Sequence, residues 1–155
     1  MSWFTAAVDP RVKIAAPIMG ISTYAADLKE NTQKLHCDCM FPINSWLHDM
    51  IHQGALIAPR PLLYGEGKRD KLFPVEGYME FYDKVGGLYK AYRQDEAFRL
   101  LEVDTGHQDS DFLRTEVSCR PEIIASPSRR RASSSSAATF RWMSIRRRAS
   151  MFRSR

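Results

Sequence analysis

The chain has 155 residues, enough for one domain of ordinary size, and 44% of them are hydrophobic, as in a globular protein. Its formal net charge of +5 is unevenly distributed. Residues 1–114 carry 13 Lys and Arg against 16 Asp and Glu, whereas residues 115–155 carry ten Arg against two Glu. The basic character therefore belongs to the C-terminal part and does not indicate an acidic partner for the rest of the chain.

Cysteine usage and hydropathy argue against a disulfide-stabilised protein and against a membrane-spanning one. The three cysteines, Cys37, Cys39 and Cys119, are odd in number and indicate no disulfide framework. No signal peptide pattern is present, and no apolar run is long enough to span a bilayer, so we expect no membrane partner. A reduced cytosolic chain is the default expectation, which depends on Met1 being the true start.

The first half of the chain predicts a helix, a strand and a polar helical region. Apolar residues at positions 3, 4, 7 and 8 lie on one face of a helix, which Asp9-Pro10 ends. Residues 12–20 are apolar with little alternation, which is typical of a strand buried on both faces of a parallel sheet. Helical spacing follows over 24–35 and 44–56, with a loop between them.

The second half alternates strands with helices. Residues 58–67 and 97–103 predict two more buried strands. Between them, residues 74–92 predict a helix, for which Gly86-Gly87 is a candidate end or break. After the last strand, Asp109 or Ser110 is a candidate cap for another helix.

This alternation predicts an α/β protein with a mostly parallel sheet. In such proteins ligands bind at the carboxyl ends of the strands. The loops over 65–73 and 104–109 are two loops of that kind.

From about residue 115 the chain becomes rich in Arg and Ser and loses its periodicity. We expect disorder there, because the segment cannot bury enough apolar surface to offset its chain entropy. The sequence RRRAS occurs at 129–133 and 146–150, which allows a basic nucleic-acid-binding arm or a pair of kinase sites. The composition is also that of a shifted reading frame in a GC-rich gene. We favour this last explanation and expect no nucleic-acid partner.

Asp70 and His107 are the first candidate for chemistry. Each follows a predicted buried strand, so neighbouring parallel strands would bring them to the same edge of the sheet. A carboxylate beside an imidazole fixes the tautomer of the ring and stabilises the imidazolium formed when the ring takes a proton. Both residues could equally be solvated loop residues. Asp104 and Asp109 are better explained as turn and cap residues.

A metal site is the second candidate. His48 and His52 are four residues apart, and His36, Cys37 and Cys39 lie nearby. The pair is similar to the zinc motif H-E-x-x-H, in which the glutamate acts as general base. Here Asp49, one methylene shorter, replaces that glutamate, and no third ligand follows at a suitable spacing. We therefore expect no metal and no other cofactor.

A nucleophile is missing from the chain. A serine esterase carries its serine in the motif G-x-S-x-G on a sharp strand-to-helix turn, and no such motif occurs in residues 1–155.

Five segments together resemble the C-terminal part of α/β-hydrolases related to acetyl xylan esterases, cephalosporin-C deacetylases and dienelactone hydrolases. They are AAVDPRVKIAAPIMG, HCDCMFPIN, GALIAPRPLL, RDKLFPVEGY and DTGHQDSDFLR. The resemblance covers residues 1–114 and implies a partial α/β-hydrolase fold, with residues 115–155 as a separate low-complexity region. It also implies that Asp70 is the acid and His107 the base of a catalytic triad.

The same resemblance implies that the serine lies just upstream of Met1, in a longer parent protein. That parent would cleave a small-molecule or carbohydrate ester through an acyl-enzyme, without a cofactor. Without its nucleophile we expect the isolated chain to be inactive as an enzyme. We also expect it to be marginally stable, since the first strands of the sheet are missing.

Overall fold

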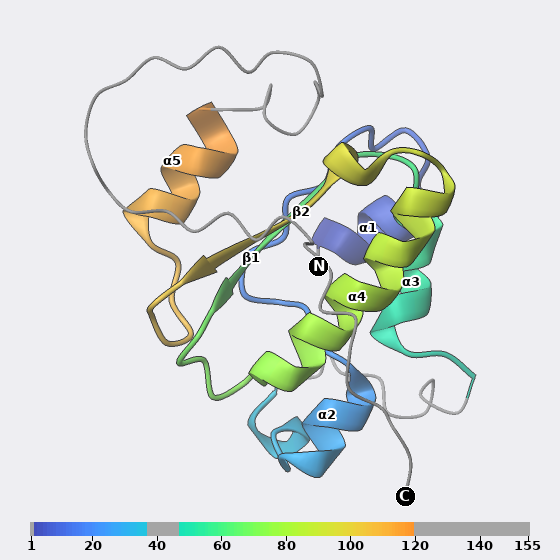
Figure 1. Ribbon diagram of the computed structural model, residues 1–155. Coiled ribbons are helices and arrows are strands. Elements are labelled where there is room, and N and C mark those ends of the chain that lie inside the picture. Colours follow the sequence, from blue (N-terminus) through green and yellow to red (C-terminus); the bar gives the residue numbers. More distant parts are fainter. Residues whose placement is uncertain (1, 37–46, 120–155) are drawn as a thin grey trace, which may run out of the picture.

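The computed structural model describes residues 2–36 and 47–119, and Figure 1 shows their arrangement. Along the described chain the elements are α1 (Ser2–Val8), α2 (Tyr24–Lys29), η1 (Gln33–Leu35), α3 (Met50–Ile57), β1 (Leu62–Gly67), α4 (Val75–Ala91), η3 (Asp95–Ala97), β2 (Phe98–Val103) and α5 (Asp111–Cys119). The alternation of helices and strands agrees with the predicted mixed α/β class.

Strands β1 and β2 pair in parallel, in a register that runs from Leu62 opposite Phe98 to Gly67 opposite Val103. The segment 12–20 runs beside β1 but forms only two isolated bridges, Ala15 with Leu62 and Ile18 with Gly65. The prediction of a continuous strand there is wrong, because Pro17 lies between the bridges. Proline has no N–H, so one ladder bond to β1 cannot form.

Helices cover both faces of this sheet. In Figure 1 α5 lies on one side of the strands, and α1, α3 and α4 lie on the other. Alternate residues of β1 point to opposite faces: Tyr64 packs in the aromatic cluster beneath α4, whereas Leu63 packs with Leu113 of α5. Strand β1 is consequently buried along its whole length, as its apolar sequence predicts.

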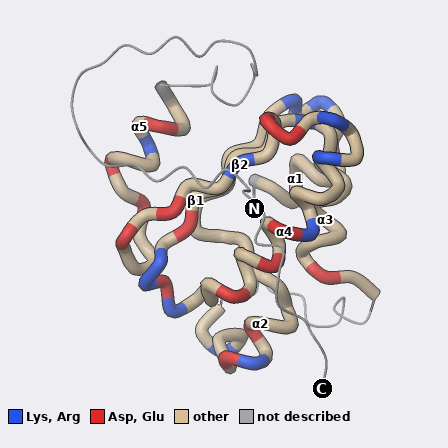
Figure 2. The backbone as a smooth tube through the Cα atoms, viewed as in Figure 1, with Lys and Arg blue, Asp and Glu red and all other residues tan. Residues whose placement is uncertain are grey.

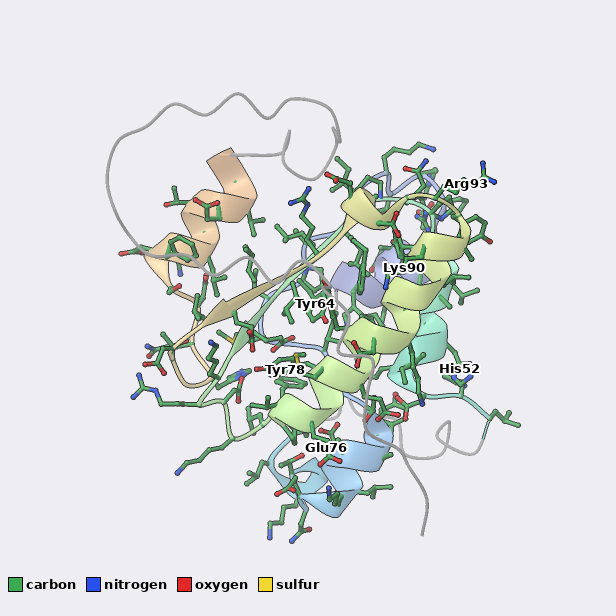
Figure 3. The ribbon with its side chains drawn as sticks, viewed as in Figure 1. His52, Tyr64, Glu76, Tyr78, Lys90 and Arg93 are labelled. Atoms are coloured by element: carbon green, nitrogen blue, oxygen red, sulfur yellow. The ribbon has the colours of Figure 1, made fainter. Side chains whose placement is uncertain are left out.

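Aromatic rings form the larger core between the sheet and α4. The rings of Phe98 and Tyr89 stack with centroids 4.9 Å apart, and the Tyr64 ring meets that of Phe81 at 5.4 Å, edge to face. The Tyr64 hydroxyl of β1 donates to the carbonyl of Tyr78 in α4, and Figure 3 labels both tyrosines. These contacts fix α4 on β1 and thereby fix the direction in which β1 ends.

Three local predictions for helices are wrong. Helix α4 continues through Gly86-Gly87, and Gly86 is buried within it, at a place where a Cβ would meet the Phe98 ring at an ordinary contact distance of 3.5 Å. In α1, Trp3 is buried as predicted, but Val8 is 78% exposed and Ala6 is buried. The helical region over 24–35 divides into α2 and η1, with Asn31 at a φ of 55° between them.

Helix α3 begins at Met50 with Asp49 as its cap, later than the predicted start at 44, although residues 44–46 lie outside the described part. Helix α5 continues past residue 114 to Cys119, so residues 115–119, which the sequence assigns to the disordered region, are helical. The Arg/Ser-rich sequence from residue 120 onward, with both RRRAS sites, lies outside the described residues, as do Cys37 and Cys39.

Charge is mixed over the structure. Figure 2 shows Lys and Arg interspersed with Asp and Glu along the described chain, without a large patch of one sign. Within that part, none of the helices combines the length and the apolar composition that crossing a membrane requires.

Candidate active site

The structure brings Asp70 and His107 together at the carboxyl end of the sheet. The His107 Nδ1 atom lies 2.8 Å from Asp70 Oδ2, within hydrogen-bonding distance. The Asp70 side chain is 0% exposed and the His107 side chain is 44% exposed. Water is therefore excluded from the carboxylate, while one side of the imidazole stays accessible.

Parallel pairing of β1 and β2 explains why the two residues meet. After the strands end, the pairing continues into the loops: the Lys68 amide donates to the Val103 carbonyl at 2.9 Å, and the Arg69 amide to the Thr105 carbonyl at 2.9 Å. Gly67 permits this approach, since a Cβ there would lie 2.7 Å from the Thr105 oxygen. The two loops are thus held as one unit.

Local bonds fix the orientation of Asp70. Its Oδ1 atom accepts the amide N–H of Leu72 at 2.7 Å, which leaves Oδ2 for His107. The ring of Phe73 lies against that of His107, with centroids 5.7 Å apart. His36 supports the same turn, because its Nε2 donates to the Leu72 carbonyl at 3.0 Å.

The hydrogen bond between the pair determines what the imidazole can do. An ionised carboxylate only accepts hydrogen bonds, so in the neutral imidazole the proton lies on Nδ1. The lone pair is then on Nε2, which is the atom that a general base uses. Orientation, solvent exclusion and tautomer all suit proton abstraction.

An open hollow of about 300 Å³ lies beside His107. Ile18 and Met19, at the end of the segment 12–20, form its apolar side. Gln108 and Asp109 form its polar side together with His107. The exposed side of His107 thus lies between an apolar and a polar surface.

Glu66 is a residue near this site that the sequence prediction missed. Its side chain is fully buried, and its Oε1 atom accepts the amide N–H groups of Ile21 at 3.0 Å and Gly20 at 3.3 Å. Burial raises the pKa of the Glu66 carboxyl well above its ordinary value. The available signal was a lone glutamate between two glycines at the end of an apolar strand.

The other carboxylates near His107 have separate partners. Asp104 forms an ion pair with Arg69, with Oδ1 2.9 Å from Nε, and Asp109 pairs with Arg114. Of the two candidate caps, Ser110 is the one whose hydroxyl accepts an amide of α5, that of Leu113. The sequence predicts that Asp104 bonds nearby backbone amides in a turn. In the structure its carboxylate pairs with Arg69 of the neighbouring loop instead.

The second candidate, His48 with His52, does not form a metal centre among the described residues. The Nδ1 atom of His52 accepts the Asp49 amide N–H at 2.8 Å, so His52 takes part in capping α3. Figure 3 shows His52 on the side of the molecule away from α5 and the carboxyl ends of the strands. No group of three or more His, Cys, Asp or Glu side chains suited to a metal occurs in residues 2–36 and 47–119.

Comparison with known proteins finds a distant similarity to a protein named as a hydrolase. No protein-family model matches it. Over 118 residues, 76% of its length, it is 26% identical to a Bacillus subtilis (strain 168) protein named "Putative hydrolase YtaP", and this similarity spans 40% of that relative. The chain is thus distantly related to a hydrolase and matches less than half of that protein's length.

Proposed function

We propose that the chain carries the acid and base residues of a carboxylic ester hydrolase that acts through a serine acyl-enzyme. The hydrogen bond between Asp70 and His107, with the carboxylate buried and the imidazole exposed beside a hollow, is the observation that carries the proposal. The distant similarity to a hydrolase supports the same general class. The resemblance to acetyl xylan esterases and dienelactone hydrolases supports an ester as the substrate.

In this mechanism His107 Nε2 removes the proton from a serine hydroxyl as the serine attacks the ester carbonyl. Asp70 stabilises the imidazolium that forms, and His107 then returns the proton to the leaving alcohol. Water, activated by the same nitrogen, releases the acid. The serine is not in a G-x-S-x-G motif of residues 1–155, so it must be supplied by sequence outside them.

The gene supplies the test. We expect the codons upstream of Met1 to encode an in-frame G-x-S-x-G motif, and the product that includes them to hydrolyse p-nitrophenyl acetate. Asp70→Asn and His107→Ala should each lower kcat by about 10²–10⁴-fold, the usual share of a general base. His48→Ala is the control and should leave kcat unchanged. A stop codon directly upstream without such a motif would contradict the proposal.

A further inference from the structure

Glu66 does not line the hollow, but it binds the turn whose Met19 does. It is the penultimate residue of β1, and its buried Oε1 atom accepts the amides of Gly20 and Ile21 across the sheet edge. Those amides belong to the turn that ends the segment 12–20. Glu66 thus links β1, which leads to Asp70, with the segment that forms the apolar side of the hollow.

The turn at the end of this segment has an unfavourable backbone conformation. Met19 has a φ of 50°, in the left-handed region that side chains other than glycine rarely adopt. Its side chain is nonetheless buried, and it lines the hollow together with Ile18 and His107. The two amides that follow Met19 point at Glu66, so the glutamate holds the chain where this conformation is required.

Gly67 brings the Met19 side chain and the His107 loop to the same place. A Cβ on Gly67 would lie 3.2 Å from the Met19 methyl carbon and 2.9 Å from the Gly106 oxygen. Any shift of the Met19 turn therefore changes the wall that faces His107. Asp70 fixes the imidazole, and Glu66 fixes the turn that carries Met19.

Resting on the proposed ester hydrolase, we propose that Glu66 is a positioning residue: its carbonyl-like Oε1 holds the Met19–Ile21 turn and so shapes the apolar wall against which the substrate lies. The role requires an acceptor oxygen at this place and no charge. The other oxygen, Oε2, is buried and has no hydrogen-bond partner in the described part of the chain. Glutamine supplies the same acceptor. Leucine has no acceptor, and the aspartate carboxylate is one methylene closer to the backbone and does not reach both amides.

The test is NMR of the full chain, labelled with ¹⁵N and with ¹³C in the methionine methyl groups. In Glu66→Leu and Glu66→Asp we expect the Gly20 and Ile21 amide protons to lose their hydrogen-bonded shifts and the Met19 methyl signal to move. The ¹⁵N shifts of the His107 ring should stay unchanged, because its bond to Asp70 is independent. Glu66→Gln should preserve every one of these signals.

Glu102→Gln is the matched control, since Glu102 lies opposite Glu66 in the register but bonds the Tyr78 hydroxyl. It should leave the Gly20, Ile21 and Met19 signals in place. Unchanged signals in both Glu66→Leu and Glu66→Asp would overturn the proposal. So would loss of the folded spectrum in both, which would make Glu66 a residue of global stability. Neither reading needs ester hydrolysis, so a failure of the proposed activity is a separate result.

Discussion

Asp70 places its two carboxyl oxygens on different partners, and this division determines the chemistry of His107. Oδ1 accepts the Leu72 amide and Oδ2 lies 2.8 Å from His107 Nδ1. In Asp70→Asn the amide oxygen must stay on the Leu72 N–H, which turns the NH₂ group toward His107. The ring nitrogen facing it must then accept, so the imidazole proton moves to Nε2.

We therefore predict that ¹⁵N NMR of neutral His107 shows the Nδ1–H tautomer in the unsubstituted chain and the Nε2–H tautomer in Asp70→Asn. Asp104→Asn is the control, because Asp104 pairs with Arg69 and not with the imidazole. Finding the Nε2–H tautomer in the unsubstituted chain would contradict the assignment of His107 as a base.

The buried carboxyl of Glu66 makes a second prediction at this scale. Burial raises its pKa in the folded chain above the ordinary value of 4.5, so above that pH the folded state holds a proton that the unfolded state releases. Glu66 thus lowers the free energy of unfolding as pH rises above 4.5, and it has no such effect at lower pH, where both states are protonated. Glu66→Gln should stabilise the chain more at pH 8 than at pH 4.

Urea unfolding of the two proteins at both pH values measures this difference directly. The comparison isolates Glu66 from Asp27, whose pKa burial also raises and which is the same in both proteins. An equal effect of the substitution at pH 4 and pH 8 would mean that Glu66 is not buried in the folded chain.

Between elements, the decisive feature is the close approach of the loops that follow β1 and β2. In Gly67→Ala the new methyl would lie 2.7 Å from a backbone oxygen, so the His107 loop must move, and we expect a loss of about 1–3 kcal/mol of stability. Gly87→Ala is the matched control, with no atom within 4 Å of the new methyl. It should instead stabilise α4 by about 0.5–1 kcal/mol.

Thermal melts of the two alanine variants test whether Gly67→Ala lowers the stability and Gly87→Ala raises it. The ¹H–¹⁵N signals of the His107 loop should move in Gly67→Ala and remain fixed in Gly87→Ala. A Gly67→Ala variant with unchanged stability would show that the two loops leave room for the added methyl group.

The sequence predicted those elements that depend on local pattern. Apolar runs gave β1 and β2, and their parallel order placed Asp70 and His107 at one edge. Where tertiary contact overrides local preference, prediction from sequence did not succeed. Gly86 reads as a helix break, yet it lies buried inside α4 beside the Phe98 ring. Pro17 likewise interrupts a ladder that the apolar pattern alone predicts to be continuous.

The site was predictable to the same degree. The pair of Asp70 and His107 follows from strand order, but the support around it comes from distant parts of the chain. His36 reaches Leu72, and Glu66 reaches Gly20, across sequence separations that no spacing rule covers. Met19 lines the hollow from a backbone with a φ of 50°, a conformation that a methionine does not signal.

For the molecule as a whole, the described sheet is small for the helices that cover it. Two paired strands and a bridging segment leave the backbone groups at the sheet edges without strand partners among the described residues. Several large apolar side chains are also exposed, including Leu47 at 88%, Val8 at 78% and Leu56 at 62%. Such exposed surface favours association and lowers cooperativity.

We therefore predict that the isolated 155-residue chain is marginally stable: a broad thermal transition by circular dichroism, binding of a hydrophobic dye below the transition, and self-association in size-exclusion chromatography. Replacing Val8 and Leu56 with lysine should reduce dye binding and association, because these side chains are exposed and make little contribution to the core. The same two substitutions should leave the Asp70–His107 signals in place, since Val8 and Leu56 are exposed and belong to neither core cluster. A sharp two-state melt of a monomer would instead mean that the two clusters beneath α4 and α5 are sufficient to stabilise the fold, and the exposed apolar residues would then need no partner.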